Sequence, residues 1–249
     1  MKKVHISKLL MVLLVSVAVI SCSKDEEGDN NNGNQSNNPG GVVVPDGKGI
    51  LVAVKTVTYT EVPGFGLTEA TVNAASAAFW ESSPSSFVNV GTVKINDLPL
   101  DFESNSKTYY SGQAAVNSLQ FPPVKWEVSG TGSIPAFTKE ISSSFPDFSG
   151  NFPATVSNAE DITISLSGKI ANADSVFVGV FADAKSQFKI VSANTASVTF
   201  SKSELSSLGT IRQVQVTPIK YIAETVSGTK LWFILEEGNT RIYNIMPGK

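Results

Sequence analysis

Short runs of alternating apolar and polar residues follow one another from residue 50 to the end of the chain. Val124, Trp126 and Val128 share one face of such a run, and Ile162 and Ile164 share a face in another. A period of two is typical of β-strands with one buried side. The pattern predicts strands at Ile50–Tyr59, Val88–Ile95, Thr108–Tyr110, Val124–Gly130, Asp161–Ser167, Ser175–Phe181, Gln187–Val191, Ala196–Phe200, Thr210–Tyr221, Lys230–Leu235 and Thr240–Ile245.

Turn and cap residues separate these runs. Asn96-Asp97 tolerates positive φ and predicts a tight turn. Glu236–Asn239 contains a Gly-Asn pair and predicts a hairpin between the last two strands. Ser201 and Glu204 have the spacing of a capping box, so we expect a short helix there that ends at Gly209.

Two stretches do not follow the simple pattern. Thr71–Trp80 stays ambiguous, because its alanines suit a helical turn while its alternation suits a strand. Residues 130–155 contain glycine and proline at a density that breaks regular elements, with phenylalanines between them. We interpret residues 130–155 as the crossing between two halves of the fold, lying against a core.

Short strands at this spacing, with one brief helix, predict an all-β fold of antiparallel sandwiches. We expect an N-terminal β-sandwich domain at 49–145 and a C-terminal one at 146–249. The passage 196–221, and Trp126–Gly130 followed by Ile134–Phe137, resemble immunoglobulin-like modules of uncharacterised Bacteroidota surface lipoproteins. The resemblance implies that both halves are immunoglobulin-like. Whether they form two domains or one continuous sandwich stays open.

The first residues of the chain predict an export signal. Three lysines precede the apolar run Leu9–Ile20, as in the n-region and h-region of a signal peptide. The run is too short to span a bilayer, which takes roughly 20 apolar residues. The Ser21-Cys22 pair that follows resembles the lipobox of bacterial lipoproteins. The resemblance implies a signal peptide of residues 1–21 and acylation of Cys22. An ordinary signal peptide with a leftover cysteine is the alternative.

Charged residues follow Cys22 closely, with Lys24 ahead of Asp25, Glu26 and Glu27. The run resembles the export signal of Bacteroidota surface lipoproteins, which implies an outer-membrane position facing the cell exterior. A periplasm-facing position and a merely solvated acidic tail are the alternatives. Because residues 29–41 hold no apolar side chain larger than proline, they cannot bury enough surface to fold. We therefore expect residues 22–48 to be a lipidated, disordered linker.

Charge argues against binding to nucleic acid. The chain has 19 basic and 22 acidic residues, and removal of residues 1–21 leaves 16 basic residues against 22 acidic ones. The mature chain therefore carries a net charge near −6. Binding to nucleic acid depends on neutralising phosphates with lysine and arginine, so we expect no such partner.

Histidine and thiol chemistry are both missing from the expected mature chain. The only histidine is His5, within the signal peptide, and the only cysteine is Cys22, which acylation would consume. Neither a Ser–His–Asp triad nor a Cys–His catalytic pair can therefore form. Zinc and copper sites built from imidazole or thiolate are excluded for the same reason. We expect a protein without a cofactor that is not an enzyme.

Carboxylates leave two kinds of chemistry open. Glycoside hydrolases need only two acids, and Glu127 and the Glu236-Glu237 pair are candidates, although alternation places Glu127 on a solvated face. Calcium takes about six to eight oxygen ligands, but no Asp-x-Asp-x-Asp-Gly loop occurs. Turn capping explains the aspartates near predicted turns better, namely Asp97, Asp101, Asp147, Asp161, Asp174 and Asp183.

Aromatic rings are the remaining candidates for binding. We expect Trp126 and Trp232 in the core, because a tryptophan on an alternating strand is usually buried. Trp80 adjoins a serine-rich loop and is our candidate for an exposed platform on which a ligand stacks. Tyr109 and Tyr110 are its candidate neighbours.

Taken together, the residues predict a non-enzymatic outer-membrane surface lipoprotein that acts as a binding or structural module. Its expected partners are membrane lipid, through acylated Cys22, and a glycan or another surface protein. A carbohydrate-binding accessory protein of a polysaccharide-uptake system and an adhesin or fimbria-like subunit are the alternatives. A hydrolase without histidine comes last, and the sequence does not identify a ligand.

Overall fold

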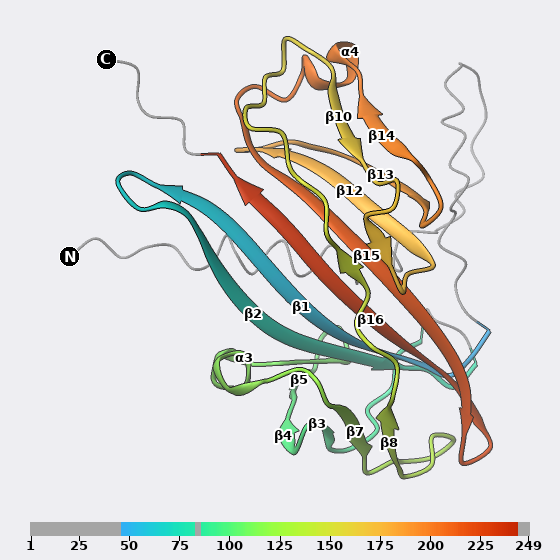
Figure 1. Cartoon of the computed structure of the whole chain (residues 1–249). Helices are drawn as coiled ribbons and strands as arrows, with labels where there is room; N and C mark the ends of the chain where they lie inside the picture. Colours follow the sequence, from blue (N-terminus) through green and yellow to red (C-terminus); the bar gives the residue numbers. More distant parts are fainter. Residues whose placement is uncertain (1–45, 83–85, 244–249) are drawn as a thin grey trace.

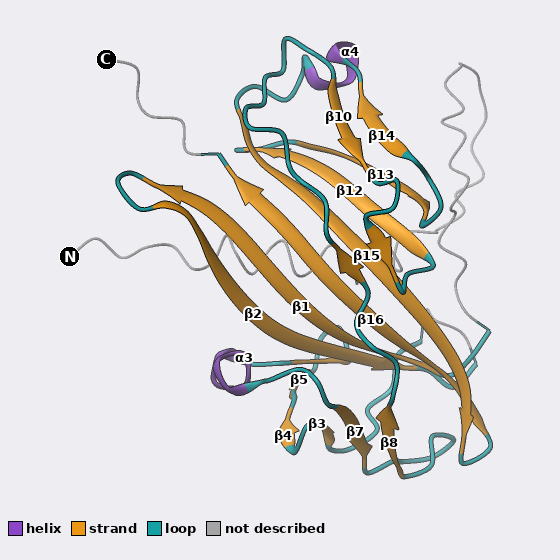
Figure 2. Ribbon diagram, in the orientation of Figure 1, coloured by secondary structure: helices purple, strands orange, loops and turns teal. Residues whose placement is uncertain are grey.

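The structure, a computed structural model, describes residues 46–82 and 86–243. Sixteen strands and two short helices make up this part of the chain, so the prediction of an all-β fold is confirmed (Figure 2). The immunoglobulin-like detail stays a prediction. Within the same ranges, no helix combines the length and the apolar character that crossing a bilayer requires.

The elements alternate between long strands and short ones along the chain. In chain order they are β1 (Gly49–Val62), β2 (Gly66–Phe79), β3 (Val93–Ile95), β4 (Leu98–Pro99), β5 (Asp101–Glu103), β6 (Thr108–Tyr110), α3 (Gln113–Ser118), β7 (Val124–Val128), β8 (Phe137–Ile141), β9 (Asp147–Phe148), β10 (Ile162–Ser165), β11 (Ile170–Ala171), β12 (Ser175–Ala182), β13 (Ser186–Ser192), β14 (Ser197–Phe200), α4 (Lys202–Leu205), β15 (Ile211–Val226) and β16 (Thr229–Ile242). Four of them, β1, β2, β15 and β16, exceed 13 residues each and form the frame of the fold.

An eight-stranded sheet in the order β13-β12-β15-β16-β1-β2-β6-β5 runs through the whole molecule (Figure 1). β1 is parallel to β16, whereas the other neighbouring strands of this sheet are antiparallel. Strands from both sides of residue 145 therefore share one sheet. The division of the chain into domains at 49–145 and 146–249 stays a prediction, but the two parts are joined by continuous backbone hydrogen bonds.

The ambiguous stretch Thr71–Trp80 belongs to strand β2. It pairs with β1 residue by residue, from Gly49 opposite Phe79 to Val62 opposite Gly66. Its alanines lie buried on both faces of the sheet, where small side chains let other residues pack closely. Pairing along the full length of β1 outweighs the helical preference of alanine, which is a weak effect by comparison.

The hairpin predicted at Glu236–Asn239 is wrong. Residues 229–242 form one strand, β16, which is paired with β15 on one side and with β1 on the other. A turn at Gly238 would break both ladders, so the strand continues through it. The actual turn lies at Ser227-Gly228, where both residues have positive φ, 49° and 78°. Positive φ at both central residues is the requirement of a type I′ hairpin.

Two smaller groups of elements cover the same face of the eight-stranded sheet. The first lobe, the sheet β4-β3-β7-β8 together with α3, buries Leu51, Phe233 and Leu235 of the large sheet. The second lobe comprises β9, β10, β11, β14 and α4, and it buries Val178 and Val216 of the large sheet. These side chains lie on one face, because Leu235 and Asn239 are an even number of residues apart and Val216 lies opposite Asn239.

The other face of the sheet carries a third apolar cluster, made of Ile50, Val52, Val54, Trp80 and Ile234. Among the described residues outside the large sheet, Phe87 packs against this cluster. Successive residues of β1 therefore point to opposite faces of the sheet, and both faces bury apolar side chains. Leu51 and Ala53 face the lobes, whereas Ile50, Val52 and Val54 face this cluster.

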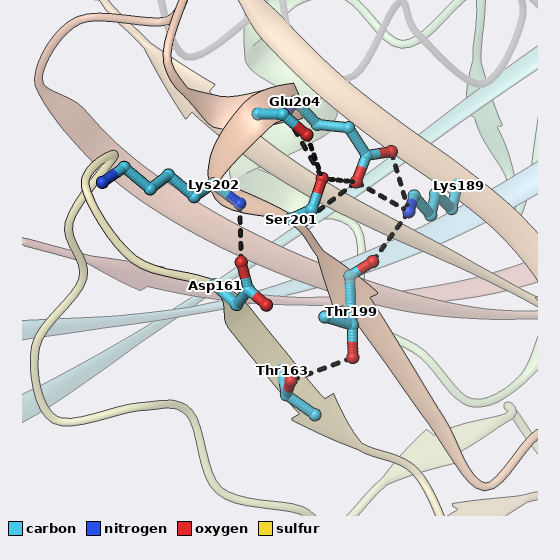
Figure 3. A network of polar contacts seen from close by, with 8 residues as sticks. Asp161, Thr163, Lys189, Thr199, Ser201, Lys202 and Glu204 are labelled. Carbon is cyan, nitrogen blue, oxygen red and sulfur yellow. Dashed lines mark hydrogen bonds and ion pairs between the residues drawn. The ribbon is translucent and has the colours of Figure 1, made fainter.

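The short helix predicted at Ser201 is confirmed as α4 (Figure 3). Its capping box is complete, since Ser201 Oγ accepts from the Glu204 N–H and the Glu204 side chain accepts from the Ser201 N–H. Asp161 Oδ1 accepts a further bond from the Lys202 N–H at 2.7 Å. Lys189 of β13 donates to the Thr199 carbonyl at 2.7 Å and pairs with Glu204 at 2.9 Å. This network fastens the outer strand of the large sheet to the second lobe.

Some shorter elements differ from the sequence prediction. Residues 130–155 contain two strands, β8 and β9, because the prolines lie beside these strands and not within them. The prediction that this stretch packs against a core is confirmed, since Phe137 and Phe148 are buried. The strand predicted at Val88–Ile95 is restricted to Val93–Ile95, because Gly91 adopts φ 81°. Helix α3, which has no side-chain cap, was not predicted.

Candidate functional site

The predicted lipidation residue, Cys22, and the predicted export signal, Lys24, Asp25, Glu26 and Glu27, lie outside the described residues. Their roles therefore stay predictions. The other predicted site residues, Trp80, Tyr109 and Tyr110, lie at one end of the large sheet, where β2 pairs with β6.

Trp80, the expected stacking platform, is buried with 2% of its surface exposed. It directly follows β2 and lies in the third apolar cluster, with its ring centroid 6.2 Å from that of Phe87. A buried ring offers no face to a ligand, so Trp80 acts as a core residue in this structure. Sequence reasoning missed this burial because the residues packed around it come from β1 and β16, which are distant in the chain.

Tyr109 is also buried, and its hydroxyl holds a loop in place. The oxygen accepts from the Val90 N–H at 2.8 Å and lies 2.9 Å from Asn89 Oδ1 and 3.0 Å from the Gly91 carbonyl, both acceptors for its proton. Burial raises the pKa of Tyr109, an effect that the bond from Val90 partly opposes. The hydroxyl has the hydrogen-bond partners that a buried phenol requires. A structural role is therefore sufficient to account for Tyr109 at this position.

Tyr110 remains exposed on β6, where it lies opposite Ser76 of β2. It is the one exposed member of the predicted trio, with 43% of its surface accessible. A shallow surface hollow of about 520 Å³ lies near Trp80, and among the described residues it is lined by 81–82, 86–88 and 105–107.

The candidate tryptophans for the core differ in burial. Trp126 is fully buried in the first lobe, as predicted. Trp232 is partly buried on the opposite face of the sheet, with the Lys230 ammonium 5.7 Å from its ring centroid. Cation–π contacts of this kind are typical of a tryptophan near a surface.

Several of the carboxylates considered for catalysis or calcium have structural partners. Glu127 pairs with Lys125 at 2.6 Å on a half-exposed strand face. Asp174 accepts from the Tyr221 N–H at 2.8 Å and from Lys220 at 3.1 Å, and Asp183 pairs with Arg212. Within the described ranges, no group of three or more histidine, cysteine or acidic side chains gathers as a metal site would require.

A polar row crosses the lobe-facing side of the sheet between the two lobes. Lys55 of β1 lies opposite Asn73 of β2 and Glu237 of β16, and its ammonium is 2.9 Å from the Glu237 carboxylate. Glu237 is buried, and Asn73 donates to the Leu119 carbonyl at 3.0 Å while its Oδ1 has no partner among the described atoms. The sequence predicted a strand at Lys55 but a turn at Glu237, and the meeting of the two side chains depends on the β1–β16 pairing.

The β1–β2 hairpin projects beyond its neighbours at the other end of the sheet (Figure 1). β16 pairs with β1 only as far as Thr60, and β6 pairs with β2 only at Ser76–Ala78. Phe65 in the turn is 84% exposed, and Leu67 at the start of β2 is 55% exposed. Exposed apolar side chains at the end of a rigid ribbon are typical of a contact surface. The sequence signal is an apolar residue held between Gly64 and Gly66 in a turn.

No known protein-family model matches the sequence, and no curated protein is detectably similar to it.

Proposed function

We propose that the mature protein is a non-enzymatic lipoprotein of the outer-membrane surface, and that it acts as a binding or structural module through its β1–β2 hairpin. The observation that supports the module most directly is the projecting turn with the exposed side chains of Phe65 and Leu67. The four long strands give this turn a stiff base, since β1 is bonded along both of its edges up to Thr60. The anchor is proposed from Cys22 and the apolar run before it.

The polar surroundings of the turn favour a protein partner over a lipid surface. Glu61 and Glu69 flank the turn on its two strands, and Glu61 pairs with Arg241 at 3.2 Å. Acidic residues near the tip oppose its insertion into an anionic leaflet. A protein surface with an apolar patch suits the turn better.

A first experiment tests the anchor. Cells producing the full chain are labelled with an alkyne fatty acid, and Cys22→Ala serves as the comparison. We expect label on the native chain alone, and release of the variant from the membrane fraction. Digestion of intact cells with a protease reports whether the folded part faces the medium. An unlabelled native chain, or one that resists the protease until the cells are lysed, would contradict the proposal.

A second experiment tests the contact element. A photo-reactive phenylalanine analogue replaces Phe65 in the full chain on intact cells, and the control carries it at Phe188, which is also exposed. We expect a covalent adduct of defined mass from position 65 and much less from position 188. Equal or absent adducts at both positions would rule out the hairpin as the contact element.

An assembly subunit of the adhesin or fimbria-like kind is the second candidate function. It is favoured by the outer edge of β2, which has no strand partner among the described residues between Gly66 and Ala75. An edge of this kind is a template for pairing with another chain.

A further inference from the structure

The backbone bonds of β2 show which of its groups point outward. The Trp80 N–H donates to the Lys48 carbonyl beside β1, so even-numbered residues of β2 bond inward. The Ala75 carbonyl, by contrast, accepts from the Ser111 N–H on the outer side. The register with β1 has no shift along the strand, so this alternation continues to the turn.

Leu67, Glu69 and Thr71 therefore turn their N–H and C=O groups to the outer edge. None of the hydrogen bonds between described residues uses these groups, and residues 66–71 are exposed. Unpaired backbone groups in a regular strand are the feature that a further strand can add to.

The two outer edges of the eight-stranded sheet are protected in ways that this edge is not. Strand β13 carries Lys189, which is tied to Thr199 and Glu204 of the second lobe. Strand β5 is only three residues long, and two of them are Asp101 and Glu103. Charged residues and short length are the usual protections of an edge strand. The open part of β2 has a single charged residue, Glu69.

We propose that the outer edge of β2 pairs with β2 of a second copy of this chain, in antiparallel orientation about a two-fold axis at Ala70. The inference rests on the proposed function, because it names the partner of the β1–β2 hairpin. In this register Glu69 lies opposite Thr71 of the second copy, and Leu67 lies opposite Asn73. The two eight-stranded sheets then join into one.

Other registers of the same pairing fit less well. An axis at Glu69 places two carboxylates directly opposite each other, which is unfavourable. An axis at Thr68 sets Thr71 opposite Phe65, beyond the end of the strand. An axis at Thr71 needs the outward groups of Ala75, which are already bonded to Ser111. The axis at Ala70 uses all the open residues and avoids these conflicts, and it additionally pairs Leu67 with Asn73, which is buried beside Leu119.

The same register gives the exposed turn a neighbour. Asn73 lies beside the first lobe, because its side chain donates to the Leu119 carbonyl at the end of α3. Leu67 of one copy, opposite Asn73 of the other, is therefore placed next to that lobe, and Phe65 lies just beyond it. Lipid anchors would hold both copies on one surface, where a high effective concentration supports an interface of modest area.

The test uses single cysteines in the full chain on membranes. At Ala70 the two copies meet in a non-hydrogen-bonded pair, with Cα atoms about 4.5 Å apart, which suits a disulfide. We expect Ala70→Cys to give a disulfide-linked dimer on non-reducing gels. Thr68→Cys is the matched control, because it is exposed on the same side of the same strand but lies about 13 Å from its counterpart. The double variant Thr68→Cys/Val72→Cys should regain the link, since residues 68 and 72 lie opposite each other.

Two further variants separate edge pairing from random collision. Thr71→Pro removes an outward N–H and leaves the β1 ladder intact, so it should abolish the Ala70→Cys dimer without lowering the unfolding midpoint. Glu69→Gln should raise the dimer fraction about two- to fivefold, because the two carboxylates are diagonal neighbours in this register.

The outcomes distinguish the two proposals. Equal linkage at positions 68 and 70, or no linkage at either, overturns the pairing of copies. If position 65 then still forms a photo-adduct with a different protein, the proposed function stands and only the identity of the partner is wrong. If no adduct forms at position 65 either, both proposals fail.

Discussion

Tyr109 fastens the loop 89–91 to the eight-stranded sheet through one hydroxyl group. Its ring packs against those of Phe79 and Phe102, with centroid separations of 6.1 Å and 5.0 Å. The loop precedes β3 and so positions the first strand of the first lobe. One buried hydroxyl oxygen therefore helps to join the large sheet to the lobe that covers it.

Tyr109→Phe should lower the free energy of unfolding by about 1–3 kcal/mol, because it leaves the buried Val90 N–H without its acceptor. Urea unfolding followed by tryptophan fluorescence measures this loss. Tyr110→Phe is the control, and its effect should stay within about 0.5 kcal/mol, since that residue is exposed. Equal losses in the two variants would show that the hydroxyl of Tyr109 has no structural role.

Alkaline titration provides a second check on the same residue. Burial raises the pKa of Tyr109 above the value of about 10 for an unfolded chain. The protonated phenol therefore stabilises the fold fully below about pH 10, and this contribution is lost as the pH rises toward the folded pKa. Between pH 10 and 12, the free energy of unfolding should fall less steeply for Tyr109→Phe than for the native chain. Parallel curves would contradict this.

Local signals made some residues predictable. The turn at Asn96-Asp97 has φ of 48° and 66°, as expected for that dipeptide, and Trp126 is buried as its alternating strand indicated. Trp80 was not predictable in this way. Its environment is set by β1 and β16, and neither the pairing nor the register of distant strands can be derived from local alternation.

At the scale of single elements, β16 is the strand on which the fold depends. It carries Glu237 in the middle of the sheet, where Lys55 of β1 neutralises it. The exposed fractions of the two side chains are 34% for Lys55 and 8% for Glu237, so the lysine is partly hydrated while the acid is not. The Gly-Asn pair beside Glu237 predicted a turn from its local preference. The prediction was wrong because distant strands are hydrogen-bonded to both edges of β16.

Removal of both charges should cost less than the sum of the two single removals. Lys55→Met leaves a buried carboxylate unpaired and should lower the free energy of unfolding by about 1–3 kcal/mol. In Lys55→Met/Glu237→Leu the loss should be smaller than the sum of the two single losses, with a coupling of about 1–2 kcal/mol in a double-mutant cycle.

A matched exposed pair provides the control for this cycle. Lys125 and Glu127 lie 2.6 Å apart on the surface of the first lobe, and their coupling should be clearly smaller, because solvent screens an exposed pair. If the two cycles gave equal couplings, the burial of Glu237 would have no influence on the pair.

At the scale of the whole molecule, the two lobes share a sheet and a face. The first lobe is built from residues before 145, yet Leu231, Phe233 and Leu235 of β16 complete its core. The all-β character and most strand positions could be predicted from alternation. The joining of the two halves could not, because the parallel pairing of β1 with β16 leaves no mark in either strand taken alone.

A fragment of residues 46–145 should therefore be unfolded. It lacks β16, so β1 loses one bonded edge and the core of the first lobe loses three large side chains. Far-UV circular dichroism and the dispersion of amide signals in NMR report the outcome, with chain 22–249 as the folded reference. A well-dispersed spectrum from the fragment would establish residues 49–145 as an independent domain.

The parallel pairing of β1 with β16 also sets the order in which the protein can fold. β1 begins at Gly49, and the strand that completes its sheet begins at Thr229. A chain that emerges from a ribosome or a translocation channel with its N-terminus first cannot close this ladder until nearly all of it has emerged. Contacts between residues so far apart slow folding, since a long loop must close before they form. The same strand pairing that unites the two halves thus keeps the early chain unfolded, which is the state that export through a narrow channel requires.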